Sequence, residues 1–209
     1  YEEEDPAVEF SDGDLSANDD SDEVFVDVEE GESEETGASV SDFSYEELNG
    51  SYVSITGYTG AEKNVVIPDS IDGFIVQKIG NGAFKNKDIE SIKFPDRMDY
   101  IGDEAFKGCT LLKTIDFNKV KGIGRSAFEG CTSLKEVEFP GSLTSIGNWG
   151  FYNCTGLSEV RLPDTLTTLG RNSFADCTNL SKTNYPMSLS SAGESIFAGD
   201  SKLKSITVP

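Results

Sequence analysis

The sequence predicts an α/β repeat solenoid, because one unit of 22 or 23 residues recurs from about residue 65 to residue 209. Three columns carry the repeat: a Phe in every unit, a Gly four residues before it, and an apolar residue before that Gly. The Phe column is Phe84, Phe106, Phe128, Phe151, Phe174 and Phe197, and the Gly column is Gly80, Gly102, Gly124, Gly147, Gly170 and Gly193. Since so short a unit cannot bury its own apolar face, successive units are expected to stack as coils.

A strand-like phrase follows each Phe, with apolar residues at its first, fourth and sixth places, as in Leu134, Val137 and Phe139. Pro closes five of the six phrases, and Pro cannot donate to a sheet ladder. We therefore expect the phrases to pair as a parallel sheet on the concave side of a right-handed superhelix. The Ile-Gly-x-x-Ala-Phe phrase is expected to return on the convex side as a short helix or 3-10 turn.

Charge divides the chain into unequal parts. Residues 1–50 hold 20 of the 38 acidic residues and none of the 17 basic ones, so the net charge of −21 belongs almost entirely to this segment. We expect residues 1–42 to be an acidic, mostly flexible leader, because such a composition buries too little apolar surface to fold. Residues 43–78 are expected to form a capping unit, and residues 79–209 the repeats. Because the last phrase ends at Pro209 without a polar cap, we expect a longer parent protein.

The unit from Ile123 to Pro140 resembles the BspA-like leucine-rich repeats of bacterial surface proteins. The shared pattern is Ile-Gly-x-x-Ala-Phe-x-x-Cys followed by Leu-x-x-Val-x-Phe-Pro, and it covers about residues 65–209. The leader, with its phrase at residues 9–13, resembles the segment behind the signal peptide of secreted Firmicutes proteins. The resemblance implies a leucine-rich-repeat fold, secretion or display on the surface of a Gram-positive bacterium, and adhesion-type binding to a protein or glycan, host matrix molecules included.

Composition argues against catalysis and against several classes of partner. The chain has no His, which excludes the usual Ser-His-Asp and Cys-His machinery, and it has no Gly-x-x-x-x-Gly-Lys phosphate loop. We expect no enzyme activity and no cofactor. An acidic leader on a nearly neutral array lacks the basic patches that nucleic acid and anionic membranes require, and no apolar run approaches the roughly 18–20 residues of a membrane span. The oligomeric state is left open.

The third and fifth residues of each strand phrase are expected to point outward on the concave side. The candidate ligand-binding residues at these positions are Lys93, Thr114, Asp116, Glu136, Glu138, Glu159, Arg161, Lys182 and Asn184. One interpretation is a solvated sheet surface, and the other is a binding face that favours a partner carrying Lys or Arg. Trp149, the single Trp of the sequence, is a candidate anchor for a partner. Its alternative is a ring lying flat over a neighbouring coil.

Four cysteines, Cys109, Cys131, Cys154 and Cys177, share one repeat column. Their spacing favours a ladder of buried thiols that act as small apolar residues, with a disulfide between adjacent coils as the alternative. Zinc is not expected, because Cys-x-x-Cys pairs are missing.

The acidic leader holds two local patterns of its own. Asp12, Asp14, Asp20 and Glu23 fall at ligand positions of a calcium loop, but Ala17 stands where that loop needs Gly, so the match is weak and no metal site is expected. Residues 23–28 alternate like a strand and could add to a sheet edge.

The leading hypothesis is a secreted or cell-surface module that binds a macromolecule through its repeats. The alternative is a structural spacer or scaffold domain within a larger surface protein.

Overall fold

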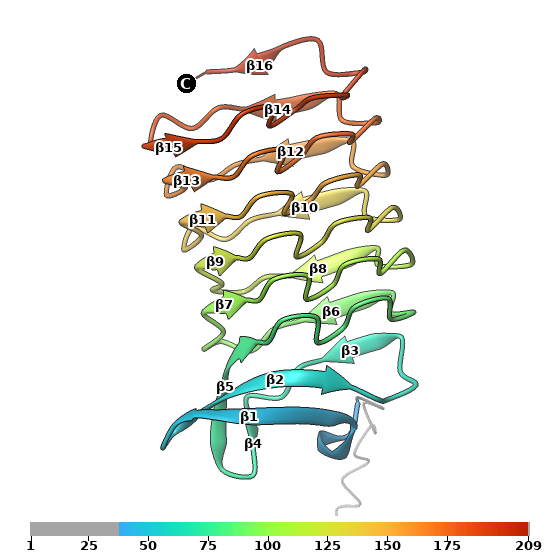
Figure 1. The fold of residues 1–209 in the computed structure, drawn as a ribbon, viewed down its shortest axis with the longest axis vertical. Helices are drawn as coiled ribbons and strands as arrows, with labels where there is room; N and C mark the ends of the chain where they lie inside the picture. Colours follow the sequence, from blue (N-terminus) through green and yellow to red (C-terminus); the bar gives the residue numbers. More distant parts are fainter. Residues whose placement is uncertain (1–37, 209) are drawn as a thin grey trace, which may run out of the picture. The chain divides into compact units, whose positions relative to one another are not determined.

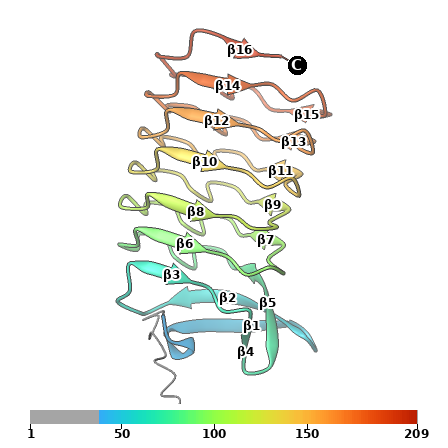
Figure 2. The same cartoon turned by 180° about the vertical axis from the view of Figure 1, so that it is seen from behind.

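The computed structural model describes residues 38–208, which form a parallel β-solenoid with two rows of short strands (Figures 1 and 2). The first row is β3 (Asn64–Val66), β6 (Ser91–Lys93), β8 (Thr114–Asp116), β10 (Glu136–Glu138), β12 (Glu159–Arg161), β14 (Lys182–Asn184) and β16 (Ile206–Thr207). The second row is β5 (Phe74–Ile79), β7 (Tyr100–Ile101), β9 (Gly122–Ile123), β11 (Ser145–Ile146), β13 (Thr168–Leu169) and β15 (Ser191–Ala192). Equivalent residues of adjacent coils pair, as Val137 does with Val160.

The array begins with two antiparallel hairpins. A 3-10 turn at Val40–Asp42 leads into β1 (Phe43–Asn49), which pairs with β2 (Tyr52–Tyr58). β4 (Ser70–Ile71) pairs with β5 across Asp72 and Gly73, whose positive φ values of 50° and 86° are those of a two-residue type I′ hairpin. Because β2 in turn pairs parallel with β5, these hairpins join the second row of strands.

The Phe column forms a continuous aromatic stack through the core. Phe106, Phe128 and Phe151 are fully buried, and their ring centroids lie 5.1 and 5.0 Å apart with planes within 13° of parallel. A second set of rings packs edge-on against this stack, as Phe117 does against Phe128 at 5.6 Å. Each Phe from Phe84 to Phe174 therefore buries its ring against the coils on both sides, which confirms the repeat columns as the core.

The Gly column is required by close approach of the main chain. A Cβ atom at Gly147 would lie 2.7 Å from the carbonyl carbon of Gly124 and from the main-chain nitrogen of Arg125, both in the preceding coil. None of the six glycines of this column has a positive φ. Adjacent coils can therefore approach to sheet spacing here only because no side chain intervenes.

The expected helical returns are not confirmed. In residues 38–208 the only helical element is the 3-10 turn at Val40–Asp42, and each return from β7 onward is a two-residue strand followed by consecutive turns. The turn N–H groups bond to the next coil, as Phe84 does to the Ala105 carbonyl at 2.7 Å. Residues two places before and after the Phe, such as Glu104 and Gly108, have positive φ. Main-chain groups used between coils in this way are not free for the i to i−4 bonds of a helix.

Candidate binding face

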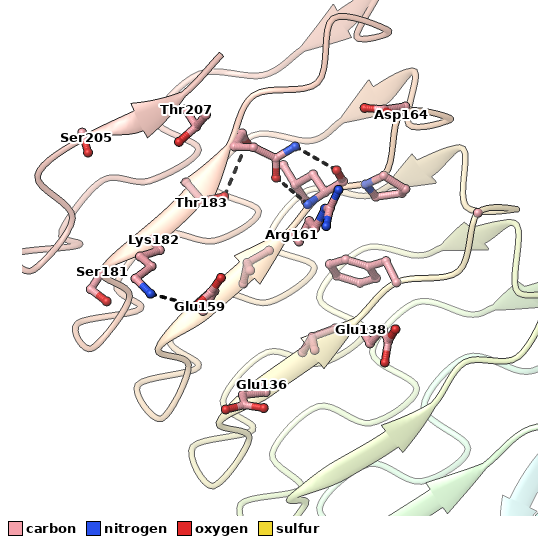
Figure 3. Close-up of a pocket in the computed structure, with 17 residues that line it drawn as sticks. Glu136, Glu138, Glu159, Arg161, Asp164, Ser181, Lys182, Thr183, Ser205 and Thr207 are labelled. Carbon is pink, nitrogen blue, oxygen red and sulfur yellow. Dashed lines mark hydrogen bonds and ion pairs between the residues drawn. The ribbon is translucent and has the colours of Figure 1, made fainter. Parts of the chain in front are cut away.

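The outward side chains of β6, β8, β10, β12, β14 and β16 form one surface, which we call the strand face. The pleat alternates as the sequence predicts: in β10, Glu136 and Glu138 are exposed, whereas Val137 between them is buried. Figure 3 shows Glu136, Glu138 and Glu159 projecting from neighbouring strands on the same side of the sheet. The predicted outward positions are therefore at the surface, although this alone does not assign them a ligand.

A shallow hollow of about 1010 Å³ lies over the strand face from β10 to β16. Its rim carries Glu136, Glu138, Glu159, Arg161 and Lys182 (Figure 3), and Asn184, Phe139 and Leu162 also line it. Ser205 and Thr207 complete the side nearest β16. Six of the nine predicted binding residues therefore surround one depression with a mixed polar and apolar lining.

The charges of the hollow are mostly unpaired. Lys182 Nζ lies 3.4 Å from Glu159 Oε2, and both side chains remain largely exposed. In residues 38–208 no ion pair within 4.0 Å engages Glu136, Glu138 or Arg161. These three groups are consequently available to a charged partner.

Asn184 has a structural role that the sequence pattern does not reveal. Its Nδ2 donates to the Leu162 carbonyl at 2.9 Å, and its Oδ1 accepts from the Leu162 N–H at 2.8 Å. The side-chain amide thus bonds to both polar groups of one residue in the preceding coil. This amide is committed to the fold, so Asn184 contributes little free hydrogen-bonding capacity to the hollow.

The remaining predicted residues, Lys93, Thr114 and Asp116, lie on a separate sheet. The ladder joins β3, β6 and β8, and a second ladder joins β10, β12, β14 and β16, with no registered pairing between β8 and β10 in the described residues. A smaller depression of about 480 Å³ lies at this break. The strand face is therefore interrupted between β8 and β10.

A shortened unit accompanies the interruption. Seven positions separate Phe117 from Gly124, whereas eight separate Phe139 from Gly147. Asn118 stands where the other units have Pro and takes a φ of 48°. The shortened segment directly follows β8, where the ladder is interrupted, and the shorter Phe-to-Gly interval is the sequence signal that accompanies the break.

Trp149 lies half-buried in a return turn, away from the strand face. Its φ of 57° is unusual for so bulky a residue. The indole Nε1–H of Trp149 donates to the side-chain oxygen of Asn172 at 3.1 Å when the amide of Asn172 is turned with its oxygen toward the ring. The indole therefore bonds to the next coil, which agrees better with the ring packed against a neighbour than with a free anchor.

The four cysteines form the predicted ladder of buried, free thiols. Each Sγ donates to the carbonyl of a Phe in the preceding coil, as Cys131 does to Phe106 at 3.3 Å and Cys154 does to Phe128 at 3.1 Å. Burial raises the pKa of all four thiols, that of Cys109 to about 11. Neutral, enclosed thiols of this kind pack and donate but do not act as nucleophiles.

Three predictions lie outside the described residues. They are the weak calcium candidate at Asp12, Asp14, Asp20 and Glu23, the strand pattern at 23–28, and the flexibility of the leader up to residue 37. Within residues 38–208 no group of three or more Cys, Asp or Glu side chains is placed to hold a metal ion. In the same part of the chain no helix has the length and apolar character needed to cross a bilayer.

Coils of this period, with two rows of short parallel strands and stacked Phe side chains, define a leucine-rich-repeat protein of the solenoid class. The profile of the BspA type leucine rich repeat region, in six copies, matches residues 77–204. The chain belongs to this family. Proteins of this repeat class typically serve as binding or scaffold modules. None of the curated proteins compared with the chain matches it.

Solved structures of bacterial leucine-rich-repeat proteins share the fold. The T. pallidum leucine rich repeat protein is 28% identical over 82% of this chain and 85% of its own, with a TM-score of 0.77. A leucine rich cell surface protein from Faecalibacterium prausnitzii is 28% identical over 80% of this chain and 53% of its own, with a TM-score of 0.58. The pneumococcal vaccine antigen PcpA shares the fold at 22% identity and a TM-score of 0.67, over 80% of this chain and 48% of its own. The chain thus spans about half the length of two of these three proteins.

Proposed function

We propose that the chain is a secreted or surface-displayed module that binds a macromolecule, protein or glycan, through the hollow of the strand face. The observation that carries the proposal is the depression from β10 to β16, whose rim holds the unpaired charges of Glu136, Glu138 and Arg161. The likeness to a leucine rich cell surface protein supports display at a cell surface. Display on a Gram-positive cell is part of the proposal and rests on the resemblance of the leader.

The charge pattern favours a partner that presents Lys or Arg side chains. Two carboxylates on β10 stand beside the exposed Glu159 on β12, because Glu136 and Glu159 are ladder partners. Exposed carboxylates attract cations with a strength that salt reduces, so binding should weaken as ionic strength rises. Arg161 offers one position for a carboxylate of the partner and thereby sets its orientation.

The test is a surface plasmon resonance screen of collagen, fibronectin, laminin and heparin against two variants. The first replaces Glu136, Glu138, Glu159 and Arg161 with Ala. The control removes the same types of charge from exposed positions outside the hollow, Glu46, Glu62, Glu194 and Arg171. We expect a bound probe to lose at least about tenfold in affinity with the first variant and to keep its affinity with the control. A probe that binds both variants equally would show that the hollow is not the binding site.

A spacer function is the second candidate, and the ion pairs between coils favour it. Lys85 bonds to Glu104 at 2.7 Å, and Lys107 to Glu129 at 3.0 Å, so charges bridge successive coils along the returns. Such bridges add modestly to the core in fixing one coil against the next. Failure of every probe to bind, with intact folding, would favour the spacer over the binding module.

A further inference from the structure

Asp200 occupies the position of the thiol ladder in the coil of residues 191–208, where the four preceding coils place Cys. Its side chain is buried, with 8% of its surface exposed. Oδ1 accepts a hydrogen bond from the main-chain N–H of Cys177 at 2.8 Å. Oδ2 is buried and has no hydrogen-bond partner among the described residues. A buried carboxylate oxygen without a donor is unfavourable, so this carboxyl group calls for a physical explanation.

The carbonyl of Phe174 is a second group without a partner. One coil earlier, the Phe151 carbonyl accepts both the thiol of Cys177 and the N–H of Cys154, each at 3.3 Å. The Cys177 N–H is directed to Asp200 instead, and no hydrogen bond within residues 38–208 reaches the Phe174 carbonyl. By the geometry of the repeat, this carbonyl faces the position that Asp200 fills. Two buried acceptors therefore lack a donor at the place where each of the four preceding coils has a thiol donor.

We propose that Asp200 is a proton-dependent lock: protonated, it donates Oδ2–H to the Phe174 carbonyl and holds the coil of residues 191–208 closed, and ionised, it releases that coil. The protonated acid supplies the donor that the thiol supplies elsewhere. The carboxylate has only acceptor atoms and faces a carbonyl oxygen of like partial charge. The lock does not depend on the proposed binding function.

The surroundings favour the protonated form. Burial raises the pKa of Asp200 to about 7; the N–H of Cys177 acts in the opposite direction, and the charge of Asp176 on the preceding coil raises it further. The thiol of Cys177 on that coil stays neutral, because burial raises its pKa as well. The two cations of the same coil bond elsewhere, Lys202 to Asn179 and Lys204 to Ser201.

The sign of the pH dependence follows from this shift. The folded coil binds a proton that the open coil, with an ordinary Asp pKa of about 4, releases. The equilibrium constant for closing the coil is therefore highest below about pH 4. Above that pH it falls about tenfold per pH unit, and near pH 7 it becomes constant again. Because Ser205 and Thr207 line the hollow, opening also removes one side of the strand face.

Hydrogen exchange followed by mass spectrometry tests the lock. After correction for intrinsic exchange, peptides from residues 191–208 should show an opening constant that rises about tenfold per pH unit between about pH 5 and pH 6.5. Peptides from residues 128–146, where the ladder carries a thiol, should show no such rise. A wild-type response that is flat for both regions would overturn the proposal.

Two substitutions separate the proton from the packing. Asp200→Asn keeps the Oδ1 acceptor, adds an N–H donor toward Phe174 and cannot ionise, so protection of residues 191–208 should become independent of pH. Asp200→Cys restores the repeat and should do the same, which covers the case in which the amide packs poorly. Asp176→Asn removes only the neighbouring charge. It should move the midpoint of the pH dependence of opening to lower pH, while the opening constant still rises with pH. If the opening constant of residues 191–208 still rose with pH in both Asp200 variants, the pH dependence would belong to another group.

Discussion

Asn184 and Leu162 are joined by two hydrogen bonds through one side chain, from Nδ2 to the Leu162 carbonyl at 2.9 Å and from the Leu162 N–H to Oδ1 at 2.8 Å. The amide thereby replaces main-chain pairing at the end of β12. Asn184→Ala should lower the free energy of unfolding by about 1–3 kcal/mol, because two main-chain groups lose their partner. Urea denaturation measures this change.

The neighbouring exposed hydroxyl provides the control for that prediction. Ser205 lines the same hollow and makes no side-chain hydrogen bond among the described residues. Ser205→Ala should change stability by less than about 0.5 kcal/mol. Equal effects of the two substitutions would contradict the structural role of Asn184.

The aromatic stack predicts different costs at two positions of one column. Phe128 lies between Phe106 and Phe151 with no exposed surface, so Phe128→Ala should cost about 3–5 kcal/mol of stability. Phe197 is half-buried and has one stacked neighbour, Phe174, at 6.0 Å, so Phe197→Ala should cost about 1–2 kcal/mol. Thermal or urea unfolding of both variants measures the difference. A Phe128→Ala protein as stable as wild type would contradict the column as core.

The sequence predicts most of this fold because the repeat places each residue type in one environment. The Phe residues from Phe84 to Phe174 and the Cys column are buried, the Gly column lies where coils approach closely, and the strand phrases form parallel ladders. The returns could not be predicted as well, because their main-chain groups bond between coils, and a residue such as Trp149 at a positive φ leaves no local pattern. The break between β8 and β10 coincides with one missing residue near Asn118, and the sequence pattern alone does not indicate that two strands lose their pairing there.

The sequence predicts where the side chains of the candidate site lie but not which hydrogen bonds and ion pairs they form. Alternation along β10 and β12 places Glu136, Glu138 and Arg161 at the surface. The commitment of Asn184 to Leu162 depends on the register between two coils, as does the pair of Lys182 with Glu159. Side-chain hydrogen bonds of this kind are set by three-dimensional neighbours, so a column of residue types cannot reveal them.

Close packing of the main chain predicts a further contrast, between two glycines of the same coil. Gly147→Ala would bring a methyl group within 2.7 Å of Gly124 and Arg125 main-chain atoms, and it should cost about 1–3 kcal/mol through overpacking. Gly141 has no atom within 4 Å of an added Cβ, so Gly141→Ala should be neutral within about 0.5 kcal/mol. Urea denaturation of the pair distinguishes close approach from a general cost of losing Gly. A destabilised Gly141→Ala protein with an unaffected Gly147→Ala protein would reverse the assignment.

The thiol ladder predicts that Cys109, Cys131, Cys154 and Cys177 are inert in the folded protein. Burial raises the pKa of all four thiols, that of Cys109 to about 11, so at about pH 8 almost no thiolate is present to react. Iodoacetamide should label none of the four thiols in the native protein and all four after unfolding in guanidinium, as counted by mass spectrometry without reductant. A Ser205→Cys variant, whose added thiol is exposed, should be labelled once in the native state and confirms that the reagent is active. Labelling of native wild type would show that the ladder opens, and fewer than four labels after unfolding would show a disulfide between coils.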